Sequence, residues 1–188
     1  MMGLYGIKNP KVIDEKAILS YSKMYNIPLE DSYVIDTSYS SFISSLDTTW
    51  NKVHFKNHLQ PLQALYYNQT GQLQSFQINC YAGGFPNLHW NRDNILTTFP
   101  PLQQAPVDNI LSLDMQLKYL KSLTTTKKVS VANYDFIVII YWNRFMSRQS
   151  ERLIHFIQDN SKLANGKKVK ILYANNDNIF AASGLITK

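Results

Sequence analysis

The most reactive side chain in this sequence of 188 residues is that of its single cysteine, Cys80. One cysteine excludes an intramolecular disulfide, a Cys-x-x-Cys redox pair and any metal site built from several cysteines. A catalytic thiolate would need a basic neighbour to lower the thiol pKa from about 8.5, and none is close to Cys80 in sequence. We therefore expect a buried or unreactive thiol. A single-thiol enzyme, assisted by a spatially adjacent His or by Arg144 and Arg148, is the alternative.

The candidate metal ligands are the four histidines, His54, His58, His89 and His155. His54 and His58 are four positions apart, a spacing that would place both rings on one face of a helix. The residues between them include no Asp or Glu to complete a metal site. Acidic residues elsewhere lie singly or at expected helix and turn boundaries, so no paired-carboxylate site is expected. The sequence therefore predicts no metal and no cofactor.

Charge and motif content argue against several other functions. The formal net charge is +6, but only 17% of residues are charged, and the pairs Lys127-Lys128 and Lys167-Lys168 are too short for a basic patch. Nucleic acid is therefore not an expected partner. The sequence has no Gly-rich phosphate loop, no Gly-x-Ser-x-Gly elbow and no nucleotide fingerprint. The longest apolar run, 136–142, is far too short for a transmembrane segment.

The location in the cell stays open between two alternatives. The first residues lack the basic start, apolar middle and cleavage site of a secretory leader, which favours the cytoplasm. The Asn-rich surface with few charges would equally suit an extracytoplasmic protein whose leader, or lipid anchor, is not part of this sequence. The residues specify no oligomeric state.

The elements that must position these side chains follow from hydrophobic spacing and capping. A helix is expected over 14–25, where Asp14 can cap the first turn, and another over 110–123. Short β-prone runs predict a strand over 32–36 and a hairpin over 62–78 around a turn that contains Gly71. The last third predicts a buried strand, a helix and a second strand, over 136–142, 148–163 and 169–173.

The pattern in the last third is typical of an α/β protein, because continuous apolar strands joined by a helix pair in parallel with both faces covered. One helix covers one face only, so helix 14–25 or helix 110–123 must cover the other. We therefore expect one mixed sheet over residues 1–188, with strand 136–142 central and the hairpin on its flank. The proline-rich segment 98–108 is the possible internal boundary, and two small lobes are the alternative.

The last third also resembles a known superfamily. The stretch FIVIIYWNRFMSRQSERLIHFIQ, followed by KVKILYANND, resembles the first strand, active-site turn, first helix and second strand of thioredoxin-like proteins. Trp142 and Phe145 occupy the aromatic places of that turn. The two cysteine places then fall on Met146 and Gln149, with Ser147 and Arg148 between them. Neither Met nor Gln can do thiol chemistry.

The hairpin carries a second part of the resemblance. Thioredoxin-like proteins have a cis-proline before the third strand and a Gly-containing turn that leads to the fourth, and Pro61 and Gly71 stand in these places. The order of the two parts is inverted, which implies a permuted or elaborated member. The run Tyr5–Pro10 is similar to the start of cysteine-free thioredoxin-like proteins, many of which have lipoprotein leaders.

The resemblance implies a non-catalytic thioredoxin-like module that binds an unknown protein or peptide, and a surface-anchored accessory lipoprotein is a further alternative. A binding surface is expected at the turn before helix 148–163, where a helix N-terminus offers free amides and a partial positive charge. The opposing interpretation is that Trp142, Phe145 and Met146 only pack this corner. The expected binding residues are Trp142, Arg144, Phe145, Met146, Ser147, Arg148, Gln149 and Pro61.

Overall fold

The computed structural model describes residues 14–46, 52–124 and 130–182. Tyr5–Pro10 and the pair Lys127-Lys128 lie outside the described residues. Among the described residues, no helix is both long enough and apolar enough to cross a membrane.

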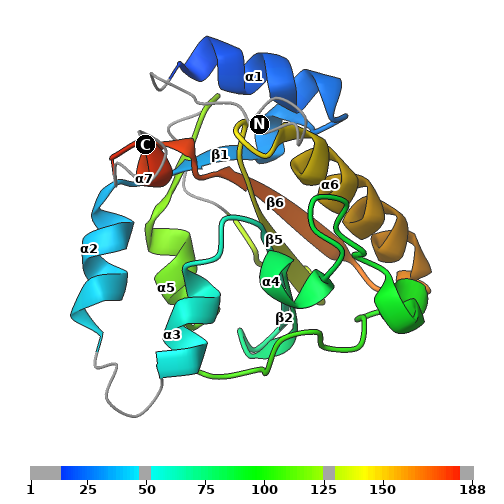
Figure 1. Ribbon diagram of the computed structural model, residues 1–188. Helices are drawn as coiled ribbons and strands as arrows, with labels where there is room; N and C mark the ends of the chain where they lie inside the picture. Colours follow the sequence, from blue (N-terminus) through cyan, green and yellow to red (C-terminus); the bar gives the residue numbers. More distant parts are fainter. Residues whose placement is uncertain (1–13, 47–51, 125–129, 183–188) are drawn as a thin grey trace.

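The centre of the fold is one six-stranded mixed sheet with the order β3-β2-β5-β6-β1-β4 (Figure 1). β5 pairs in parallel with β6, and β6 with β1, whereas β2, β3 and β4 run antiparallel to their neighbours. The expected α/β class, the parallel pair and the flanking hairpin are confirmed. The strands are β1 (Ser32–Ile35), β2 (Gln63–Asn68), β3 (Leu73–Ile78), β4 (Leu120–Ser122), β5 (Phe136–Trp142) and β6 (Val169–Asn175).

Helices connect the strands and cover the sheet. Asp14 caps the first of them as expected, because its Oδ1 accepts hydrogen bonds from the amides of Lys16 and Ala17 at 3.0 and 3.3 Å. The α-helices are α1 (Glu15–Met24), α2 (Ser38–Ser45), α3 (Lys52–His58), α4 (Asn79–Ala82), α5 (Leu113–Lys118), α6 (Ser147–Ser161) and α7 (Asp177–Ala182). The 3₁₀ turns are η2 (Leu29–Asp31), η3 (Arg92–Thr97) and η4 (Lys162–Ala164).

The central strand β5 is buried on both faces, since its seven residues are all buried and those from Ile137 to Trp142 alternate between two hydrophobic cores. Ile137 and Tyr141 pack with residues of α2, α3 and α5, which Figure 1 shows on one side of the sheet. Val138 and Trp142 pack with residues of α1 and α6 on the other face. Thus α5 lies opposite α6, whereas α1 shares the face that α6 covers.

The expected helix over 110–123 is wrong in its second half. α5 ends at Lys118, and the chain continues as β4, which pairs antiparallel with β1 through Ile35 and Leu120. The carbonyl of Tyr119 already accepts a hydrogen bond from the amide of Asp36 at 2.8 Å. Pairing with the open edge of β1 therefore replaces the helical hydrogen bonds that this segment would otherwise make.

Candidate functional site

The turn between β5 and α6 is held by two buried polar residues, Asn143 and Ser150. The amide of Asn143 donates to Ser150 Oγ at 3.1 Å, and the same hydroxyl donates to the Asn143 carbonyl at 2.7 Å. Asn143 Oδ1 accepts a hydrogen bond from the amide of Met146 at 2.9 Å, just before α6 begins. These bonds fix the backbone of the turn without help from a ligand.

The same asparagine joins the turn to the segment before β2. Nδ2 of Asn143 donates to the carbonyl of Pro61 at 2.9 Å, and Nδ2 of Asn176 donates to that carbonyl at 3.0 Å. The structure therefore brings Pro61 next to the expected turn. In the described part of the chain the cis peptide bonds precede Pro86 and Pro100, so the peptide bond before Pro61 is not cis. Pro61, which the resemblance places at the family's cis-proline, therefore lacks that peptide geometry.

Met146 and Gln149, the two residues that the resemblance aligns with cysteines, differ in exposure. Met146 is half-buried at the start of α6, whereas Gln149 is 3% exposed. The amide group of Gln149 accepts from the backbone of Leu88 at 3.2 Å and donates to the carbonyl of Pro86 at 2.5 Å. The side chain of Gln149 thus holds the 86–88 segment against α6.

Other residues of the turn also make contacts within the protein. Trp142 is 1% exposed, and its ring meets that of Tyr25 edge-on at 5.6 Å. Phe145 packs against Phe180 at a ring distance of 5.3 Å. Ser147 is half-buried, and its carbonyl accepts a 2.9 Å hydrogen bond from the hydroxyl of Tyr25. The aromatic residues thus pack the corner, and the amides of Asn143, Arg144 and Met146 are bonded within the protein rather than free as expected, while Met146 stays half-buried.

The two arginines of the turn already have partners. Arg144 donates from Nε to Asp177 Oδ2 at 2.6 Å and from its backbone amide to Oδ1 at 2.8 Å, and the carboxylate is 1% exposed. The charge of Arg144 is therefore neutralised by Asp177 at the start of α7. Arg148 is exposed and donates to the side chain of Asn87.

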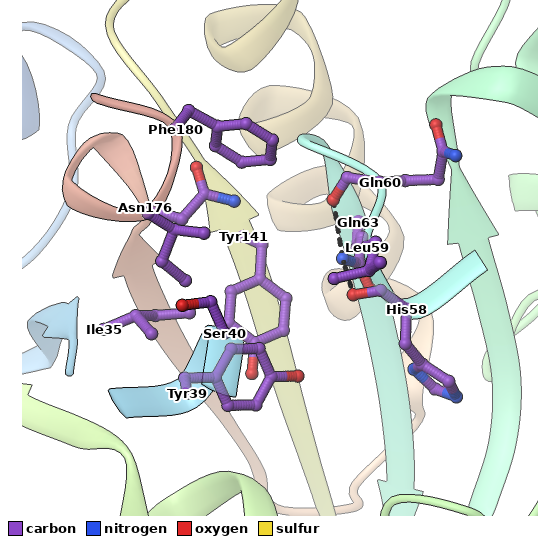
Figure 2. Close-up of a pocket in the computed structure, with 11 residues that line it drawn as sticks. Ile35, Tyr39, Ser40, His58, Leu59, Gln60, Gln63, Tyr141, Asn176 and Phe180 are labelled. Carbon is purple, nitrogen blue, oxygen red and sulfur yellow. Dashed lines mark hydrogen bonds between the residues drawn. The ribbon is translucent and has the colours of Figure 1, made fainter. Parts of the chain in front are cut away.

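A hollow of about 310 Å³ opens beside this turn, at the carboxyl ends of the parallel strands. Ile35 ends β1, Tyr141 lies near the end of β5, and Asn176 follows β6. In open α/β sheets this edge is where ligands bind. Figure 2 shows the side chains around the hollow. They are Ile35, Tyr39, Ser40, His58, Leu59, Gln60, Gln63, Tyr141, Asn176, Ile179 and Phe180.

Two tyrosine rings form an uncharged wall of the hollow. The rings of Tyr39 and Tyr141 stack with centroids 6.3 Å apart and an interplanar angle of 25°. Both hydroxyls donate to Oε1 of Gln116 on α5, at 3.1 Å for Tyr39. Burial raises the pKa of both phenols well above their usual value. They present aromatic surface, and their hydroxyls are committed to α5.

Gln63 stands opposite Tyr141 in the antiparallel pairing of β2 with β5, and it is 3% exposed. Its Nε2 donates to the carbonyls of His58 and Gln60, at 2.9 and 2.6 Å. Two acceptors on one side fix which end of the amide is nitrogen. The other end, Oε1, is buried and has no hydrogen-bond partner. An unpaired buried acceptor of this kind costs folding free energy.

The two histidines of α3 share one carboxylate, that of Asp108. His54 Nδ1 lies 3.0 Å from Asp108 Oδ2, and His58 Nε2 lies 3.0 Å from Oδ1. The expected placement on one helix face is confirmed, but an acidic partner exists 50 positions beyond His58. Burial acts to raise the pKa of Asp108, yet the hydrogen bond and charge of His58, with smaller contributions from the amide of Ile110 and from His54, lower it overall.

The remaining reactive residues do not gather at the hollow. Cys80 is exposed on α4, and desolvation raises the pKa of its thiol although the charge of Lys56 acts to lower it. His89 is exposed, and His155 is half-buried on α6. Within 14–46, 52–124 and 130–182, no group of three or more His, Cys, Asp or Glu residues is arranged to hold a metal ion.

Comparisons of the chain with family models, with curated proteins and with solved structures give no match. The functional conclusion therefore rests on the geometry at the carboxyl edge of the sheet. Local sequence patterns identified the turn and Pro61, but they missed the hollow, which is assembled from residues between Ile35 and Phe180. The available sequence signal for the hollow was Gln63, a polar residue at the first position of the buried strand QALYYN.

Proposed function

We propose that this protein is a redox-inactive, thioredoxin-like binding module whose ligand is a short segment of another protein, held at the carboxyl edge of the sheet. Two segments carry the resemblance, and they lie side by side: β2 pairs with β5 from Gln63 and Tyr141 to Asn68 and Phe136. The contact between Asn143 and Pro61 then brings the turn and the start of the hairpin together. This adjacency supports a permuted thioredoxin-like arrangement.

The observation that carries the proposal is the hollow itself. Its walls combine aromatic and aliphatic side chains with the buried amide groups of Gln63 and Asn176. Apolar surface with a few fixed amides suits recognition of a peptide, because the apolar part receives a side chain and the amides match peptide groups. About 310 Å³ is at the lower end of the range for drug-sized ligands and fits one large side chain.

The chemistry of the edge favours binding over catalysis. Met146 and Gln149 supply no thiol, and Arg144 is neutralised by Asp177. The tyrosine hydroxyls of the hollow are held by Gln116 and stay protonated at neutral pH, because burial raises their pKa. The groups that face a ligand are thus preformed and uncharged, which lowers the ordering cost of binding.

The test is selection of binders from a random-peptide phage library against the full chain, followed by NMR titration. We expect the selected peptides to shift the side-chain amide signals of Gln60, Gln63 and Asn176. A Leu59→Trp variant fills the hollow from its rim, where Leu59 is 37% exposed, and should weaken binding at least about tenfold. Leu163→Trp adds the same side chain at the exposed turn η4 and should leave binding unchanged. Peptides that bind both variants as tightly as the parent chain would contradict the proposal.

A further inference from the structure

We infer that the segment bound at the hollow is acidic: an apolar side chain enters the hollow, and Asp or Glu residues within about three positions of it contact Lys52 and Lys56 on α3. This inference rests on the proposed function, since it names the charge of the peptide that the hollow binds. It goes further, because it assigns part of the specificity to two lysines that lie outside the hollow.

The two lysines and Leu59 form one exposed stripe that ends at the rim of the hollow. Lys52 and Lys56 lie on α3 and Leu59 directly follows it, so the three have the i, i+4 and i+7 spacing of a single helix face. All three residues are exposed, and Leu59 lines the hollow. Gln60, which also lines the hollow, donates from Nε2 to the carbonyl of Lys56 at 3.2 Å. The stripe is therefore continuous with the opening.

The carboxylate that contacts α3 is bound by the other face of the helix. Asp108 accepts contacts from His54 and His58 at 3.0 Å each, and its side chain is only 7% exposed. Within the described parts of the chain, no ion pair includes Lys52 or Lys56. The two ammonium groups thus face solvent without an acidic partner from these parts.

The elements around the stripe are poor in acidic residues. The sequence contains no Asp or Glu between Asp47 and Asp93, a stretch that includes α3, β2, β3 and α4. α2 has no charged residue, and α5 has one acidic and one basic residue. Asp36, after β1, and Asp177, at the start of α7, each pair with a basic side chain. The α3 side of the hollow therefore carries positive charge that an anionic partner would complement.

The spacing of the stripe defines where the acidic residues of the partner should lie. At a rise of 1.5 Å per residue, Lys56 lies about 5 Å and Lys52 about 10 Å from Leu59 along the helix axis. An extended segment covers this length in about three residues. The hollow supplies apolar contact area, while charges at its rim select the sign of the partner and speed its association.

The first experiment repeats the phage selection with three chains: the parent, Lys52→Gln with Lys56→Gln, and Lys16→Gln with Lys23→Gln. The control lysines are exposed on α1, on the other face of the sheet, and no ion pair of the described residues includes them. Both variants therefore lose the same charge. We expect Asp and Glu within about three positions of an apolar anchor to be enriched by the parent and the control, but not by the α3 variant.

The second experiment uses one synthetic peptide from the parent selection and a form with Asn or Gln in place of each Asp and Glu. Fluorescence anisotropy in about 0.05 M salt should show about fivefold tighter binding of the acidic form to the parent chain. This difference should shrink in about 0.5 M salt, because salt screens exposed charges. The α3 variant should bind the acidic form about fivefold more weakly than the parent, and the α1 control should change its affinity by less than about twofold.

The outcomes separate the inference from the proposed function. Equal affinity of the parent chain for the two peptide forms in low salt would overturn the inference without use of any variant. If these peptides still shift the amide signals of Gln63 and Asn176 and bind Leu59→Trp more weakly, the proposed function stands without the inference. N-acetyl-hexaglutamate amide that binds the parent and Leu59→Trp as tightly as the selected peptide binds the parent would show that charge alone attracts it, and would contradict both.

Discussion

Asn143 donates a 2.9 Å hydrogen bond from Nδ2 to the carbonyl of Pro61, which lies 82 positions earlier in the chain. Oδ1 of Asn143 also accepts a hydrogen bond from the amide of Met146. One buried side chain therefore connects the start of α6 to the segment before β2. Asn176, which follows β6, donates to the same carbonyl. The ends of β5 and β6 and the start of β2 are therefore connected through hydrogen bonds to the carbonyl oxygen of Pro61. The edge of the sheet that carries the hollow is thus formed before any ligand binds.

The first prediction concerns thiol chemistry at the turn. The chain has no cysteine pair, so we expect no catalysis of insulin reduction by dithiothreitol above the uncatalysed rate. In a Cys80→Ser background, Met146→Cys with Gln149→Cys should form an intramolecular disulfide on mild oxidation, because residues three apart in a helical turn face each other. Mass spectrometry before and after alkylation measures this bond.

A matched pair controls for proximity alone. Ser147→Cys with Gln149→Cys, in the same background, places two thiols two positions apart, where helical side chains diverge. This variant should stay reduced under the same conditions. Disulfide formation to the same extent in both variants would argue against the assignment of Met146 and Gln149 to the cysteine places.

The second prediction concerns a buried amide that joins three elements. Asn160 on α6 accepts from the hydroxyl of Tyr66 at 3.0 Å and donates to the carbonyls of Leu96 and Thr98, at 2.9 and 2.7 Å. Asn160→Leu leaves these groups without their partner and should lower the free energy of unfolding by about 3 kcal/mol. Urea unfolding measures the loss. Asp159→Leu, at the exposed neighbouring position, should change it by less than about 0.5 kcal/mol.

The sequence predicted elements well where local signals agreed. The apolar run 136–142 is buried on both faces, and its bounds match those of β5. Asp14 and the helical spacing of apolar residues from Ile13 to Tyr25 marked α1 in the same way. Helix 110–123 failed because leucines at positions 113, 117 and 120 fit a helix face, while Leu120 also fits a strand. The edge of β1, far away in sequence, decided between these two structures.

The candidate site was predictable only in part, for the same physical reason. The turn at 142–149 is continuous in sequence, so a strand, a turn and a helix start were sufficient to find it. The hollow requires Ile35, Gln63, Tyr141 and Phe180 to meet, and sheet order alone brings them together. Asp108 illustrates the same limit, because no local pattern connects it to His54 and His58.

The third prediction concerns acid stability at Asp108. The folded protein holds the pKa of this carboxyl below its ordinary value of about 3.9, mainly through His58 working against the effect of burial. A lowered folded pKa means that the carboxylate stabilises the fold above the unfolded pKa and loses this effect as the pH falls through the folded one. Asp108→Asn should therefore be less stable than the parent chain at pH 7. The difference should shrink below a pH of about 4.

Urea unfolding over a series of pH values measures this difference. His58→Gln provides the matched background, since it removes the main partner of Asp108 while keeping a polar side chain. In that background, Asp108→Asn should cost less at neutral pH, and its pH dependence should be smaller. A difference between parent and Asp108→Asn that stays constant from neutral to acid pH would contradict the assigned role of the carboxylate.

The last prediction concerns the interdependence of the two halves of the chain. If the chain is divided after residue 105, the N-terminal piece contains β1, β2 and β3, and the C-terminal piece contains β4, β5 and β6. The sheet order β3-β2-β5-β6-β1-β4 places β1 between two strands of the other piece, β6 and β4. Without the N-terminal piece, β5 loses its neighbour β2 and β6 loses its neighbour β1. Expressed separately, residues 1–105 and 106–188 should each lack a cooperative unfolding transition by circular dichroism, because seven apolar residues of β5 would lose cover. Co-expression should restore one folded complex, and two independently cooperative, soluble fragments would instead mean two domains.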